Sequence, residues 1–162
     1  MNNLAENPLY QFSELRKYSL HTVGDLASLV SYIHHSGPCS ANIVRMSKRG
    51  FVLDSCGRAT KTGMVLTKPY VNVNTNVVRP KSLADITIRQ AQVITIIATT
   101  PNPTYANLAG KLEVIGLERS ALVSLAKSGY LHFVNKQHVL TEHGKVALTY
   151  LRDLFNVTNY SY

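Results

Sequence analysis

The sequence has few of the residues that define several protein classes. It contains only 2 cysteines, Cys39 and Cys56, which is too few for a disulfide-stabilised framework, and we expect both to be free thiols. Its 9 glycines and 6 prolines are too few for a fibrous or disordered chain. With 45% hydrophobic and 16% charged residues, the chain instead has the composition of an ordinary globular protein.

Long apolar segments are also missing. The longest apolar stretch, residues 93–98, is far shorter than the roughly 20 residues that cross a bilayer. Residues 1–8 have neither the basic start nor the apolar core of a secretory signal. We therefore expect an intracellular, cytoplasmic protein that has no membrane partner.

Residue groupings typical of catalysis are absent as well. The 9 acidic residues are dispersed, and they form neither a carboxylate pair nor a Ser, His and Asp grouping in the sequence. No glycine-rich phosphate loop occurs. His34 and His35 could bind zinc together with Cys39 and Cys56, but their spacing fits no standard zinc site. We therefore expect no enzyme activity, no catalytic residues, no cofactor and no metal.

Basic charge is the first positive signal. The chain has 17 Lys and Arg, which gives a formal net charge of +8 at pH 7. Much of the excess positive charge lies between residues 45 and 68. This segment has one acidic residue, Asp54, and the basic residues Arg45, Lys48, Arg49, Arg58, Lys61 and Lys68. A concentrated basic patch favours a polyanionic partner. Nucleic acid is the first candidate, and an anionic membrane surface is the alternative.

The sequence also repeats itself. Residues 43–52 align with residues 122–131, preserving apolar, small, lysine and glycine positions. Upstream, Leu26-Ala27 matches Leu108-Ala109, and downstream, residues 65–67 match residues 139–141. The distances between these matches differ in the two copies, as loops allow. We therefore expect one small structural unit to occur twice.

The second copy predicts four helices and a hairpin. Thr87, Thr104 and Thr141 are candidate N-caps, and Gly129 is a candidate helix stop. Alternating apolar residues after Gly129 predict two short strands. The expected order is a helix over residues 88–98, a helix over 105–112, a helix over 117–128, a hairpin over 131–140 that turns at Asn135-Lys136, and a helix over 142–155.

The first copy predicts a similar series with a longer hairpin. We expect a helix from about residue 24 to 33, broken at residues 36–38, and a second helix over residues 40–49. Strands over residues 51–55 and 64–71 would then form a wing whose basic tip is residues 56–63. Residues 70–78 alternate and are expected to form a strand or linker.

The second copy resembles the winged helix-turn-helix superfamily, and the MarR-type DNA-binding domains in particular. The resemblance is carried by residues 87–94, Leu108-Ala109, residues 125–131 and residues 140–144. It implies a mainly α fold with small β-hairpin wings, in which two winged helix-turn-helix domains follow one another. The expected boundaries are residues 1–80, an N-terminal domain with a long basic wing, and residues 81–162, a C-terminal MarR-like domain.

The resemblance also implies which residues meet DNA. The third helix of each domain would enter a major groove, and the wing would contact phosphate or the minor groove. We expect the first copy to dominate the electrostatics. Its candidate DNA contacts are Ser40, Asn42, Arg45, Lys48, Arg49, Arg58, Thr60, Lys61 and Thr62. The second copy offers Arg119, Ser120, Ser124, Lys127, Lys136 and Gln137.

These observations predict a sequence-specific protein that binds double-stranded DNA and regulates transcription, as a monomeric pseudo-dimer or a homodimer. We therefore expect it to associate with the nucleoid. Two alternatives stay open. Winged helices also serve as protein-interaction adaptors, here toward transcription or replication machinery, and small replication initiators use tandem winged helices. Charged residues on an outward helix face are also often simply solvated, so charge alone does not choose between these functions.

Overall fold

A computed structural model of the chain describes residues 20–39, 43–44, 52–54 and 56–155. These residues are mainly helical, with one small two-stranded antiparallel sheet. The elements are α2 (Val23–His34), α4 (Lys61–Thr67), the 3-10 helix η3 (Lys68–Tyr70), α5 (Ile88–Thr99), α6 (Tyr105–Val114), α7 (Arg119–Lys127), β1 (Leu131–Val134), β2 (Gln137–Leu140) and α8 (Glu142–Phe155).

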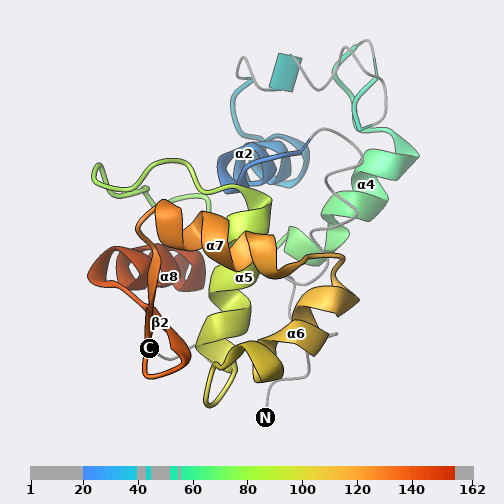
Figure 1. Cartoon of the computed structure of the whole chain (residues 1–162). Helices are drawn as coiled ribbons and strands as arrows, with labels where there is room; N and C mark the ends of the chain where they lie inside the picture. Colours follow the sequence, from blue (N-terminus) through green and yellow to red (C-terminus); the bar gives the residue numbers. More distant parts are fainter. Residues whose placement is uncertain (1–19, 40–42, 45–51, 55, 156–162) are drawn as a thin grey trace.

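Helix α5 is the centre of the fold. It contacts α6, α7, α8 and strand β2, and α7 crosses in front of it in Figure 1. Nearly every residue from Ile88 to Ile97 is buried, because this helix is apolar on almost all sides. A helix without a polar face has to be surrounded by other elements. Helix α5 therefore organises a core that includes residues from both halves of the chain.

Three of the helix starts predicted for the second copy, at residues 88, 105 and 142, are confirmed, whereas α7 begins at Arg119 and not at residue 117. Thr87 caps α5, and its side chain accepts a hydrogen bond from the N–H of Gln90 while the Gln90 side chain accepts one from the N–H of Thr87. This reciprocal capping box satisfies two amides that the helix itself leaves unpaired. Thr104 caps α6 in the same manner, by accepting from Asn107 N–H.

The predicted hairpin is also confirmed. Strands β1 and β2 pair antiparallel, with Leu131 opposite Leu140 and Val134 opposite Gln137. Between them, Asn135 and Lys136 have φ of 52° and 64°, the left-handed conformation that a tight two-residue hairpin turn needs. Before β1, Gly129 ends α7 with φ of 85°, a conformation that glycine adopts without steric cost.

Helix α8 begins with a three-part contact. The side chain of Thr141 accepts a hydrogen bond from Gly144 N–H at 3.0 Å, and the N–H of Thr141 donates to the Tyr130 carbonyl at 3.0 Å. A Cβ atom at Gly144 would overlap that same carbonyl oxygen. The start of α8 therefore lies directly against the start of β1, and only glycine fits at this position.

The same arrangement occurs at the start of α4. The side chain of Thr60 accepts from Gly63 N–H at 3.1 Å, and the N–H of Thr60 donates to the Val52 carbonyl at 3.1 Å. A Cβ at Gly63 would overlap the Val52 carbonyl oxygen. Leu53, which follows Val52, pairs with Ala59 in an isolated antiparallel bridge. The three-part contact of threonine, glycine and backbone carbonyl therefore appears once in each half of the chain, next to an antiparallel pairing that is Leu53 with Ala59 in the first half and Leu131 with Leu140 in the second.

The prediction of a long wing in the first copy is wrong. Residues 64–71, expected to be its second strand, lie largely in α4 and η3. The chain reverses much earlier, because the Asp54 carboxylate accepts hydrogen bonds from the N–H groups of Cys56 and Arg58 and so holds a short turn. Thr60 then caps a helix, so the structural counterpart of Thr141 is Thr60, not Thr67.

The two halves of the chain contact each other at several points. Thr22, the N-cap of α2, forms an antiparallel bridge with Thr87, the N-cap of α5. The N–H of Asn74 donates to the Leu154 carbonyl at 2.7 Å. The ring of Tyr70 meets that of Phe155 edge-on, with centroids 6.3 Å apart. Residues on both sides of the sequence midpoint therefore share one packed interior.

Two adjacent histidines fasten the end of α2. The Thr67 hydroxyl donates to the Gly63 carbonyl, so the Nε2–H of His34 is the donor in its 2.8 Å contact with Thr67. The Nε2 of His35 lies 2.7 Å from the Val71 carbonyl. Burial lowers the pKa of His34, and the neighbouring His35 lowers it further. The His34 ring therefore connects the end of α2 to the end of α4, and the His35 ring connects it to the residue after η3.

Within the described part of the chain, no helix has both the length and the apolar character needed to cross a bilayer. Cys39 and Cys56 are exposed and are not joined in a disulfide.

Candidate nucleic-acid interface

Helix α7 presents one exposed face. Its buried residues are Ala121, Leu122 and Leu125, which pack toward α5 and α6. The exposed residues of the opposite face are Arg119, Ser120, Val123, Ser124, Ala126 and Lys127. The four polar members of this face are those that the sequence predicted for the second copy. They come together because the helical repeat places them on one side.

Arg119 is held in place by an aromatic ring. Its guanidinium lies 4.8 Å from the centroid of Tyr105, the first residue of α6. An arginine over a tyrosine face gains about 0.5–1 kcal/mol at an exposed site and loses some side-chain freedom. The contact joins the starts of α6 and α7, so the guanidinium is positioned before any ligand arrives.

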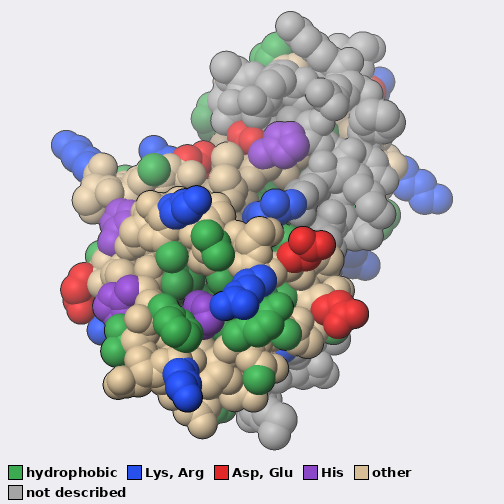
Figure 2. Space-filling view, viewed as in Figure 1, with side chains coloured by type: hydrophobic (Ala, Val, Ile, Leu, Met, Phe, Trp, Pro, Cys, Tyr) green, Lys and Arg blue, Asp and Glu red, His purple; other side chains and the backbone are tan. Residues whose placement is uncertain are grey.

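A groove of about 420 Å³ runs between α7 and β1. Figure 2 shows hydrophobic side chains grouped around lysine, arginine and histidine on this face. Val123 is 48% exposed and Phe133 is 62% exposed, so the groove is open to solvent and partly apolar. Its lining residues are Arg119, Leu122, Val123, Ala126, Lys127, Leu131, Phe133 and His138.

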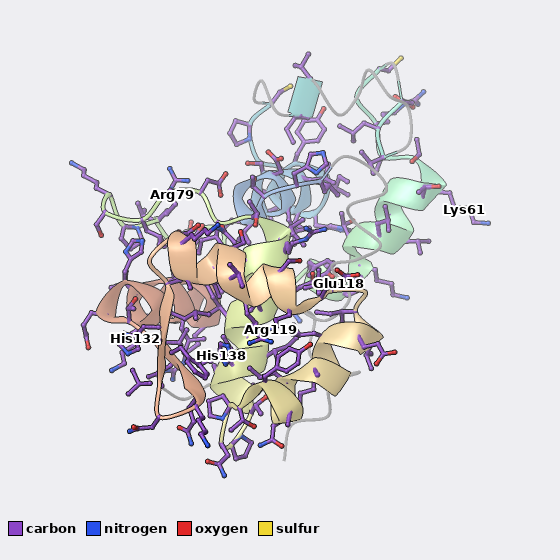
Figure 3. All side chains as sticks on the ribbon, viewed as in Figure 1. Lys61, Arg79, Glu118, Arg119, His132 and His138 are labelled. Atoms are coloured by element: carbon purple, nitrogen blue, oxygen red, sulfur yellow. The ribbon has the colours of Figure 1, made fainter. Side chains whose placement is uncertain are left out.

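His138 lines this groove from β2. Its ring packs against Phe133 with centroids 4.9 Å apart, and Figure 3 shows it beside Arg119. Burial lowers the pKa of His138; the Pro103 carbonyl opposes this shift and the positive charge of Arg119 adds to it. The buried Nδ1 has no hydrogen-bond partner among the residues that the structure describes. Because its pKa is lowered, His138 is neutral at pH 7, and its ring forms one side of the groove.

The hairpin residues of the prediction have different environments. Lys136 is exposed in the turn between the strands. Gln137 instead donates from Nε2 to the Asn102 side chain at 2.7 Å, and the N–H of His138 donates to the Pro103 carbonyl. These two bonds fasten the wing to the turn before α6. Lys136 is therefore available to a ligand, whereas Gln137 has a structural partner.

The candidates of the first copy are only partly placed. Ser40, Asn42, Arg45, Lys48 and Arg49 lie outside the described residues. Thr60 is the N-cap of α4, and Lys61 and Thr62 form the first turn of that helix, not the tip of a wing. In Figure 3, Lys61 points outward at the edge of the molecule, away from Arg119.

Arg58 lies in the Asp54 turn, and its Nε is 3.6 Å from the Asp54 carboxylate. The arginine side chain is 81% exposed, so this is a weak surface pair that leaves most of the guanidinium open to solvent.

The sequence reasoning missed Val123 and Phe133. Apolar residues on predicted helices and strands are normally core residues, and their exposure depends on how the elements pack. One local signal was available: Val123 lies between Arg119 and Lys127 at helical spacing, on the polar side of α7. In the described ranges, no group of three or more His, Cys, Asp or Glu residues is arranged to hold a metal ion.

No protein-family model matches the chain, and comparisons with curated proteins and with solved structures found no match.

Proposed function

We propose that this protein binds double-stranded DNA sequence-specifically and regulates transcription, with α7 as a major-groove helix. The observation that carries the proposal is the exposed face of α7. It presents two cations and two hydroxyls, and Arg119 is oriented by Tyr105. Arginine suits guanine or phosphate, and serine hydroxyls and lysine suit phosphate.

The arrangement around α7 supports this proposal. A short turn over residues 115–118 joins helices α6 and α7, and the hairpin β1–β2 follows α7 directly. A helix-turn-helix uses its second helix to read bases, and an adjacent wing can contact the backbone. Lys136 at the tip of the hairpin would supply that contact.

The recurring start of α4 and α8 supports a second unit. Residues 1–80 and 81–162 would each form a winged-helix domain, with Arg58 and Lys61 among the cations of the first. Two such units in one chain would act as a pseudo-dimer on neighbouring half-sites, about 34 Å apart if both meet one face of the duplex.

Selection of bound duplexes from a random pool tests the proposal, followed by fluorescence anisotropy on the enriched sequence. The variant Arg119→Ala should weaken binding by about tenfold or more, since a good bidentate contact to a base is worth about 1–3 kcal/mol. Lys145→Ala is the charge-matched control, because Lys145 lies on α8 beside Glu142 and lines a different groove. Failure to enrich any sequence, or equal losses in both variants, would contradict the proposal.

The apolar part of the groove favours a second candidate, a protein-interaction adaptor. Phe133 and Val123 line the groove and are 62% and 48% exposed, and exposed apolar residues beside an arginine are common in protein interfaces. This candidate predicts a complex that persists in high salt and is lost on Phe133→Ser, without measurable DNA binding. A steep loss of binding to DNA as salt increases distinguishes the first function from it.

A further inference from the structure

We propose that Val123 is a specificity-determining residue that recognises the 5-methyl group of a thymine in the major groove. The inference rests on the proposed function, since it needs α7 to lie in that groove. It adds a base preference that the charged residues of α7 do not give. Thymine is the base whose major-groove edge carries a methyl group, and apolar side chains contact that group.

Val123 lies between two cations on the exposed face of α7. Arg119, Val123 and Lys127 follow one another at spacings of four residues, so they form one stripe along the exposed face of α7. With a rise of 1.5 Å per residue, successive members are about 6 Å apart along the axis. Val123 is therefore at the middle of the stripe, about 6 Å along the helix axis from the level of each cation.

Val123 does not contribute to the packing of α7 against the core. The buried side of α7 is supplied by Ala121, Leu122 and Leu125, which are 7%, 2% and 1% exposed. Val123 is 48% exposed and points to the side of the helix that carries Arg119 and Lys127. An apolar residue with two cations around it is therefore turned toward the surface that a polyanion would cover.

Charge and shape restrict what would occupy this position. The two cations would approach the phosphate walls or base edges of the groove, which brings a base edge over the residue between them. Valine has no side-chain hydrogen-bond donor or acceptor, so it cannot distinguish bases by hydrogen bonds. A methyl group is the apolar feature of the major groove that it can bury.

Replacement of thymine by uracil gives the sharpest test, because it removes only the methyl group and keeps every hydrogen-bonding atom. Each thymine of the enriched duplex is replaced in turn by deoxyuridine, and affinities are measured for the full-length wild type and for Val123→Ala. At one position, uracil should weaken the wild type by about fourfold, the value expected for one buried methyl group. Val123→Ala should lose most of this discrimination at the same position.

Two further variants make the result specific. Val123→Ile keeps an apolar branched side chain and should keep the preference for thymine. Val114→Ala is the control, because Val114 is 79% exposed at the end of α6, outside the stripe, and should leave the discrimination unchanged. Thermal unfolding of each variant confirms that this surface substitution leaves the fold intact.

The outcomes separate the two proposals. If the wild type binds duplex DNA and tolerates uracil at every position, or if Val123→Ala retains the full methyl discrimination, the assignment of Val123 is wrong while DNA binding stands. If the wild type enriches no duplex, the proposed function is wrong and the assignment with it.

Discussion

Thr22 and Thr87 form an antiparallel β-bridge with each other, and each is the N-cap of a helix. The N–H of Val23 donates to the Ile86 carbonyl at 2.9 Å, and the N–H of Ile88 donates to the His21 carbonyl at 2.9 Å. Helices α2 and α5 therefore start from one shared point. This junction fixes the two halves of the chain relative to one another at the beginning of the central helix.

Substitutions of Asp85 test how much this junction contributes to the stability of the fold. Its Oδ1 accepts a hydrogen bond from Gly24 N–H at 3.1 Å, at the positive end of α2. Asp85→Ala should lower the free energy of unfolding by about 1 kcal/mol, the usual cost of losing a cap. Asp85→Asn keeps an oxygen acceptor and should lose less. Urea denaturation measures both, and equal losses in the two variants would show that the hydrogen bond contributes nothing.

Glycine substitutions test the recurring helix start. Gly144→Ala and Gly63→Ala should each destabilise the protein, since the added Cβ overlaps a backbone carbonyl oxygen that cannot easily move. Gly110→Ala in α6 meets no atom within 4 Å and should raise the free energy of unfolding by about 0.5–1 kcal/mol. Thermal or urea unfolding of the three variants checks the signs. A stable Gly63→Ala protein would argue against the similarity of the two halves.

Gln92 carries a buried amide with no partner. Its side chain is 1% exposed, and neither Nε2 nor Oε1 has a hydrogen-bond partner within the described ranges. Gln92→Met keeps a similar length and removes these polar atoms, so it should raise the free energy of unfolding by about 1–3 kcal/mol. Gln90→Met is the matched control. It should lower stability, because Gln90 completes the capping box of α5.

Acid should destabilise the fold. The pKa of His138 and that of His34 are lowered from the ordinary value of 6.5. At pH values above 6.5, both rings are neutral in the folded and in the unfolded state, so neither ring lowers the free energy of unfolding in that range. As the pH falls below 6.5, the unfolded state takes up protons first, and the free energy of unfolding decreases. Urea denaturation at pH 7.5 and 5.5 should show a smaller decrease for His138→Gln than for the wild type.

An equal decrease in the His138→Gln variant would show that His138 contributes nothing to the acid sensitivity of the fold.

The second half of the chain was predictable because its signals are local. Threonine caps, a glycine stop and a tight turn each act within a few residues, and they placed the starts of α5 and α6 and both strands correctly. The first half was predicted wrongly because residues 65–67 match residues 139–141 in sequence, which placed a strand over residues 64–71, whereas residues 61–67 form α4. The Thr60 cap and the contact of Thr67 with His34 on α2 make them helical.

The candidate site was predictable only in its polar part. The helical repeat brought Arg119, Ser124 and Lys127 to one face as expected. The exposure of Val123 and Phe133 depends on the angle between α7 and the hairpin, which no short sequence pattern determines. Gln137 looked equally available from its sequence position, but its partner, Asn102, comes from a distant turn.

The salt dependence of duplex binding tests the account most directly. Log affinity against log salt concentration should fall steeply for the wild type, with a slope of about −0.9 for each phosphate contacted. Lys127→Ala should make this slope shallower by about 0.9, whereas Lys145→Ala should leave it unchanged. Binding that is absent, indifferent to salt, or altered equally by the two lysine substitutions would contradict the claim that α7 meets DNA.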